Sequence, residues 1–167
     1  HPDIGRIVSL VRDRNLYCAV STNLNQTRFL ENLVIAEPSS IKISVSGSSQ
    51  ATYGRTHRKG QIDAVMSNMR LLRRLVDAHG KRIDIFIGYH DYIGNDGDEL
   101  AGMEALAREL SFGIRHKIAR FSPLEKMLPL CSDESSIGDA DRALYDLLLV
   151  KPHEWSRVAT DGGFDDT

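Results

Sequence analysis

Residues 41–47 of the chain read Ile-Lys-Ile-Ser-Val-Ser-Gly. Apolar and polar side chains alternate along this stretch, which is the pattern of a β-strand with one apolar and one polar face. Gly47 follows directly and permits a tight turn with a positive φ, close to a ligand. We therefore predict a strand over 41–46 whose polar face carries Lys42, Ser44 and Ser46.

Strand and helix periodicities alternate on both sides of this strand. This alternation predicts parallel strands joined by helical crossovers, in either a barrel or a doubly wound α/β sheet. The expected strands are 16–23, 41–46, 83–87 and 114–121, and the charged triplet 115–117 interrupts the apolar pattern of the last one. A Gly/Asn/Asp-rich loop covers 88–98. The expected helices are 4–11 (with Asp3 as N-cap), 29–34, 62–76 and 100–110.

The polar row of the strand 41–46 favours a barrel. In a barrel the apolar face of a strand packs outward against helices, so Lys42, Ser44 and Ser46 would point into the lumen. Branched apolar side chains usually fill that lumen, so a polar row predicts a ligand cavity. An open sheet whose polar side faces water explains the same pattern.

The strand–helix rhythm stops after Pro123. A short helix over 124–130, a polar loop, a helix over 139–150 and a linker over 162–167 are expected there. We therefore divide the chain into 1–130, a partial barrel, and 131–167, a helical extension towards a further domain. Both ends of the sequence are expected to be cut.

Composition excludes several classes of protein. The 167 residues carry a formal net charge of -2 with 41% hydrophobic and 26% charged residues, and no basic stripe indicates nucleic-acid binding. No apolar run approaches the roughly 20 residues of a membrane span. Two widely separated cysteines, Cys18 and Cys131, indicate a reducing, cytoplasmic location. His57, His116 and His153 lack metal-ligand spacing and are expected to be structural.

Candidate binding residues follow the expected strands, because ligands of α/β folds lie beyond the carboxyl ends of parallel strands. Arg55 and Arg58 are of the type that binds carboxylates through paired hydrogen bonds, although a solvated basic surface explains either residue alone. Tyr89 and His90 combine an aromatic ring with an acid–base group and predict a substrate contact, although a hydrogen-bonded surface loop is the alternative.

Five stretches, in order, resemble motifs of the radical S-adenosylmethionine (SAM) enzymes. The segment 1–4 looks like the residues after the family's Gly-Gly-Glu-Pro, and 21–24 is similar to Ser/Thr-Thr-Asn-Gly with Leu24 in place of glycine. Residues 43–47 resemble the Ser-x-Asp-Gly of the fourth strand with Ser46 in place of aspartate. Residues 53–60 resemble Tyr-x-Arg…Arg-Gly-Gly, and 104–110 resemble the helix before the last strand.

The resemblance implies a partial (β/α)6, TIM-barrel-like fold that binds SAM and a [4Fe-4S] cluster. Reductive cleavage of SAM would give a 5′-deoxyadenosyl radical that takes a hydrogen from a small-molecule or peptide substrate, with a flavodoxin or ferredoxin as reductant. The implied SAM-binding residues are Asn23, Ser44, Ser46, Arg55 and Arg58, with Arg55 on the SAM carboxylate, and the implied substrate-binding residues are Tyr89 and His90.

The sequence departs from this family in its cysteines. The Cys-x-x-x-Cys-x-x-Cys motif that holds the cluster is absent, as are the first two strands, so the cluster ligands are expected outside this chain and the fragment alone is expected to be inactive. A C-terminal cysteine-rich domain with auxiliary clusters is a further expectation. Two alternatives remain: a non-catalytic barrel that binds a small molecule, and a metal-free isomerase or lyase that uses His90 and Asp91.

Overall fold

A computed structural model describes residues 1–120, 124–131 and 133–154 of the chain. These residues form two compact units. The first contains 1–90 and 95–117, and the second contains 91–94 and the residues from 118 onward. We describe each unit by itself. The expected linker at 162–167 and the expected strand residue Phe121 lie outside the described residues.

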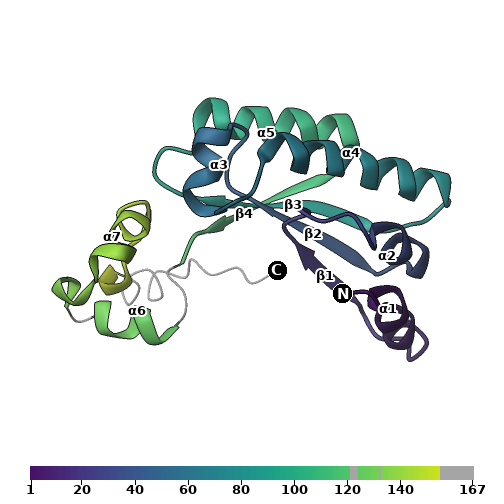
Figure 1. Cartoon of the computed structure of the whole chain (residues 1–167), viewed down its shortest axis with the longest axis horizontal. Helices are drawn as coiled ribbons and strands as arrows, with labels where there is room; N and C mark the ends of the chain where they lie inside the picture. Colours follow the sequence, from purple (N-terminus) through teal and green to yellow (C-terminus); the bar gives the residue numbers. More distant parts are fainter. Residues whose placement is uncertain (121–123, 132, 155–167) are drawn as a thin grey trace. The chain divides into compact units, whose positions relative to one another are not determined.

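The first unit is an α/β structure with a four-stranded, all-parallel sheet in the order β1-β2-β3-β4 (Figure 1). Its strands are β1 (Ala19–Thr22), β2 (Ser40–Val45), β3 (Asp84–Asp91) and β4 (Gly113–Ile118). Lys42 of β2 pairs with Ser21 of β1 and Phe86 of β3. Paired residues of parallel strands share a face, so this register fixes which side chains lie together.

This unit has five helices: α1 (Ile4–Arg12), which precedes β1, and four that connect the strands, α2 (Leu30–Ala36), α3 (Gln50–Thr56), α4 (Ile62–Ala78) and α5 (Gly97–Leu110). α1 packs against α2, α2 against α4, and α4 against both α3 and α5. Figure 1 shows α3, α4 and α5 on one side of the sheet. One apolar core joins α1, α2, α4 and α5 to the apolar side chains of the strands, among them Ile41, Ile43, Ile85 and Ile87.

The opposite face of the sheet has a different composition. By alternation it carries the other side chains of β2, β3 and β4, and no helix of this unit covers it in the described part of the chain. We call it the open face. Its residues include Lys42, Ser44, Phe86, Gly88, His90, Arg115 and Lys117.

The sequence predicted every strand but misjudged several ends. β1 begins at Ala19 rather than residue 16, because Leu16 turns back to hydrogen-bond Val11. β3 continues to Asp91, where a loop was expected, because its pairing with β2 reaches Tyr89 and the backbone oxygen of Asp91 accepts from the Ala119 N–H (3.2 Å), just after β4. Asp3 occupies the N-cap position of α1 but makes no side-chain cap hydrogen bond. α3 was not predicted at all.

The second unit contains α6 (Leu124–Leu130), α7 (Asp139–Tyr145) and two 3-10 turns, η1 (Glu134–Ser136) and η2 (Pro152–Glu154). α6 has the predicted bounds, whereas α7 ends five residues before the predicted Val150 because turn hydrogen bonds from Leu147 to Leu144 and from Leu148 to Tyr145 replace the helical pattern. A separate small core contains Ala119, Leu130, Ile137, Tyr145 and Leu148. No helix in the described ranges is long and apolar enough to cross a membrane.

Candidate functional site

The site is built at the carboxyl end of β2, where the chain turns into α3. A Cβ added to Gly47 would lie 2.6 Å from the Cγ2 atom of Thr52. Gly47 does not have a positive φ, contrary to the expectation from sequence. Glycine is required there because the first turn of α3 approaches so closely.

Glu99 of α5 fixes this turn. Its carboxylate accepts hydrogen bonds from the backbone N–H of Ser48 (2.6 Å) and Ser49 (2.8 Å) and from the hydroxyl of Thr52 (2.9 Å). The hydroxyls of Ser48 and Ser49 donate to it as well. Burial alone would raise the pKa of Glu99, but these hydrogen bonds outweigh it and lower the pKa to about 2. The carboxylate therefore holds α3 in place in its charged form.

Ser46, at the end of β2, forms a polar cluster with Thr56 and His57 at the end of α3. The Ser46 hydroxyl lies 2.6 Å from the Thr56 hydroxyl and 3.1 Å from Nδ1 of His57. The ring of His57 stacks on Tyr53 with centroids 4.3 Å apart. Ser46 is therefore 1% exposed and engaged with its neighbours, where the sequence predicted a SAM contact.

The charge of His90 acts on the imidazole of His57. Burial lowers the pKa of the His57 imidazole, and the charge of His90 lowers it further. His90 is half-buried at the carboxyl end of β3, and its backbone oxygen accepts from the buried amide of Asn95 (2.7 Å). The same Asn95 amide donates to the backbone oxygen of Ser46 (2.9 Å), so one side chain links the ends of β2 and β3.

The other predicted residues divide into exposed and buried groups. Asn23 and the two arginines, Arg55 and Arg58, are exposed, and neither guanidinium forms an ion pair or hydrogen bond with any residue in the described ranges. Ser44 is half-buried on the open face. Tyr89 is fully buried, pairs with Val45 on the helix-covered face and donates its hydroxyl to the Asn95 oxygen. Its side chain therefore points away from the open face, where a substrate contact was expected.

Sequence reasoning missed His57, Asn95 and Glu99. His57 is expected from sequence to be structural, because Ser46 and His90 come near it only through the return of α3 and the pairing of β2 with β3. The partners of Glu99 lie about fifty residues earlier in the chain. Ser49 was a weak signal for the start of α3, because serine is common at helix N-caps. In the structure Ser49 caps α3 by accepting from the Thr52 N–H (3.3 Å).

Comparison with known proteins adds no assignment to this geometry. Neither the family models nor the curated proteins that we searched match the chain.

Proposed function

We propose that this chain is the SAM-binding part of a radical SAM enzyme, folded as a partial (β/α)6 barrel. One observation carries the proposal: the parallel strands follow each other in chain order, with helices over one face and polar side chains on the other. Crossovers that always move in one direction keep their helices on one side, as in a barrel. A doubly wound sheet reverses direction and covers both faces.

Leu24 gives independent support for the resemblance. It occupies the place of the glycine in the Ser/Thr-Thr-Asn-Gly motif, and its φ is 55°, in the left-handed region that favours glycine. Its side chain is 1% exposed. A backbone conformation that favours glycine is thus present where the family's motif has glycine, and burial of the leucine side chain offsets the strain.

The predicted SAM-binding residues are available to a ligand in part. Arg55 would bind the SAM carboxylate, with Arg58 as second candidate, because both guanidinium groups are exposed and unpaired within the described ranges. Asn23 and Ser44 would line the remainder of the site. Ser46 would act indirectly, by holding Thr56 and His57. SAM, if bound here and cleaved by an electron from a cluster held outside this chain, would supply the group that abstracts hydrogen from a substrate near His90.

The [4Fe-4S] cluster does not fit the residues of this chain. Such clusters are held by cysteine thiolates. The sequence contains two cysteines, of which Cys18 is buried in the core of the first unit. The described residues contain no group of three or more His, Cys, Asp or Glu that could hold a metal. We therefore propose that the cluster ligands come from residues outside this sequence.

A second candidate function rests on the two histidines. Burial and the charge of His90 favour the neutral form of His57, which is the form of a general base. An isomerase or lyase that uses His90 and His57 would retain turnover without iron, and His90→Gln would abolish it. Turnover that requires SAM and an added reductant would exclude this candidate.

Binding of SAM tests the first proposal directly. Titration of the chain with SAM, followed by amide shifts in NMR spectra, should give saturable shifts at Asn23, Ser44 and Arg55. Arg55→Met should weaken binding about tenfold, because it removes a charge-assisted pair. The control Arg74→Met removes the same charge from an exposed position on α4 and should have little effect.

Two results would contradict the proposal. If SAM binding is not saturable, Asn23, Ser44 and Arg55 do not form a SAM site. A reconstituted preparation of this chain that absorbs at about 400 nm, as thiolate-bound iron–sulfur clusters do, and cleaves SAM would refute the placement of the ligands outside it.

A further inference from the structure

Lys42 lies in the middle of the open face, with its side chain laid over Gly88. A Cβ added to Gly88 would lie 3.1 Å from both Cγ and Cδ of Lys42, so the aliphatic stem crosses that glycine directly. Lys42 is half-buried, and its ammonium forms no ion pair or hydrogen bond with any residue that the structure describes. A lysine whose stem packs on the sheet in this way presents its ammonium at the open face, where it can bind an anionic partner.

The surrounding charges do not supply that partner. The guanidinium of Arg115 in β4 lies 3.8 Å from the centroid of the Phe86 ring and pairs with the Asp84 carboxylate at 3.1 Å. Asp84, the acidic residue of the described strands on the open face, is therefore already paired. A Cβ on Gly113 would lie 3.3 Å from that of Phe86, which puts Gly113, Arg115 and Lys117 on the open face by alternation.

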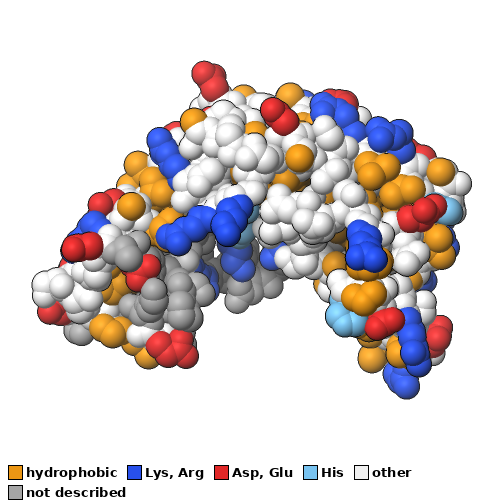
Figure 2. Space-filling model, in the orientation of Figure 1, with side chains coloured by type: hydrophobic (Ala, Val, Ile, Leu, Met, Phe, Trp, Pro, Cys, Tyr) orange, Lys and Arg blue, Asp and Glu red, His pale blue; other side chains and the backbone are white. Residues whose placement is uncertain are grey.

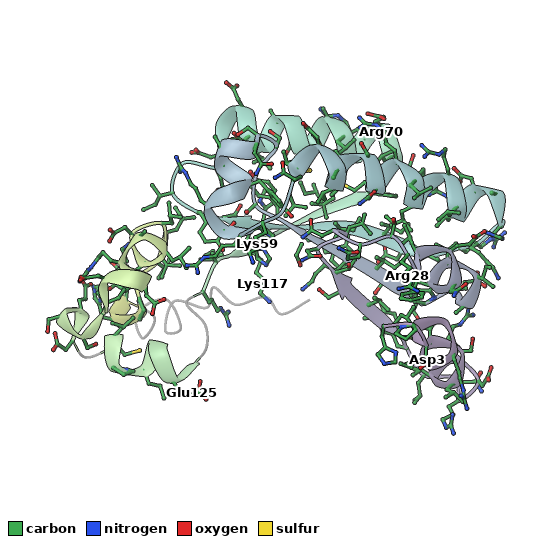
Figure 3. All side chains as sticks on the ribbon, in the orientation of Figure 1. Asp3, Arg28, Lys59, Arg70, Lys117 and Glu125 are labelled. Carbon is green, nitrogen blue, oxygen red and sulfur yellow. The ribbon has the colours of Figure 1, made fainter. Side chains whose placement is uncertain are left out.

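Lys117 adds a second unpaired charge. It is exposed and has no ion pair within the described ranges. Figure 3 shows it on the side of the sheet away from α4 and α5, whereas Arg70 lies on the helix side. Figure 2 shows Lys and Arg side chains at the surface in the middle of this view, near the places where Figure 3 labels Lys59 and Lys117. The open face therefore has a net positive charge.

We propose that the open face binds an anionic group, a carboxylate or a phosphate, of the small-molecule substrate. Lys42 and Lys117 provide the charges, and the half-buried hydroxyl of Ser44, two residues from Lys42 on the same face, provides a neutral donor. Both anions accept charge-assisted hydrogen bonds from such groups. Gly88 has no side chain, so the lysine stem can lie flat across β3 and present its ammonium at the open face. Assignment of the anion to the substrate rests on the proposed function, whereas anion binding itself requires no SAM.

Titration with simple anions tests this proposal. The chain is titrated with inorganic phosphate and, separately, with succinate, at constant ionic strength and without SAM, while amide shifts are followed by NMR. Saturable shifts are expected at 42–44, 86–90 and 115–117 with at least one anion, and the anion that binds more tightly identifies the class of ligand.

Matched variants separate this site from general charge attraction. Lys42→Met keeps an unbranched stem over Gly88 and should weaken binding about tenfold, because it removes one charge-assisted hydrogen bond. Arg74→Met, on the helix side, should change affinity less than about twofold because exposed charges interact weakly across a protein. Should Lys42→Met fail to fold, Lys117→Met and the charge-preserving Lys42→Arg serve instead: the former should weaken binding and the latter should retain it.

Two outcomes would overturn the proposal: no saturable shift with either anion, or equal losses in Lys42→Met and Arg74→Met. SAM binding that depends on Arg55 but persists without anion binding refutes this inference alone. Anion binding without SAM binding refutes the proposed function alone.

Discussion

Glu99 is the residue on which the placement of α3 depends. Its carboxylate collects hydrogen bonds from two backbone N–H groups and three hydroxyls at the start of that helix. The hydrogen bonds favour the charged form, since they lower the pKa of Glu99 to about 2 from a usual value of 4.5. The geometry thus makes the stability of this region depend on pH.

We predict that Glu99→Gln lowers the free energy of unfolding by about 2 kcal/mol at pH 7, because hydrogen bonds to a charged group are lost. The folded-state pKa lies below the unfolded one, so this stabilisation is complete above pH 4.5 and disappears as the pH falls towards 2. Urea unfolding at pH 7 and pH 3 measures the effect. Glu104→Gln, on the same helix, is the control, and a difference from wild type that is as large at pH 3 as at pH 7 would contradict the prediction.

His57 gives a second prediction at this scale. Burial, and then the charge of His90, lower the pKa of its imidazole. We expect the ring signals of His57 in an NMR titration to change below pH 6.5, and His90→Gln to raise the pKa partway. A lowered His pKa in the folded state means that stability decreases as the pH falls through 6.5, since the unfolded chain binds the proton more readily. An unchanged His57 pKa in His90→Gln would exclude the electrostatic contact.

At the scale of an element, α3 is held by close contact at its start. We predict that Gly47→Ala destabilises the chain by about 2 kcal/mol, the range of overpacked sites, because its Cβ would overlap Thr52 and lie 3.1 Å from Glu99 Oε2. Gly54→Ala is the matched control in the same helix. Its Cβ would meet the Gln50 side chain at an ordinary 3.4 Å, so a gain of up to about 1 kcal/mol is expected from helix propensity.

Thermal or urea unfolding of the two variants distinguishes a contact effect from a propensity effect. Destabilisation of both variants to the same extent would show that α3 tolerates no added side chain anywhere. Stabilisation of Gly47→Ala would show that the turn before α3 is loose.

At the scale of the whole molecule, the described residues form two cores. Ile43 belongs to the core of the first unit and Leu148 to that of the second. We predict that Leu148→Ala increases hydrogen exchange in the amides of the second unit and leaves β2 and β3 protected, whereas Ile43→Ala has the reverse effect. Each change removes a buried aliphatic side chain, a loss of about 2–5 kcal/mol, and local opening follows the unit that loses it.

Hydrogen exchange measured by mass spectrometry resolves both regions. Equal acceleration in both units by either variant would contradict the division into separately stabilised units.

The sequence by itself determined the strands and the character of their two faces. Ile41, Ile43 and Val45 alternate with Lys42 and Ser44, and this period of two is a local property of the chain that packing preserves. The α/β class and the open face follow from that alternation. The ends of helices and strands were less predictable. The end of β3, for example, depends on how far its neighbour β2 continues beside it.

Tertiary structure decided which polar residues remain available. Ser46 has the periodicity of an open-face residue, but the return of α3 brings Thr56 and His57 against it and buries it. α3 itself had no periodic signal, and its start is held by Glu99, a long-range partner. Lys42 keeps its stem on the open face because Gly88 of β3 has no side chain where the stem crosses it. Local periodicity therefore assigned each side chain to a face, whereas long-range hydrogen bonds and close contacts decided which of them could meet a ligand.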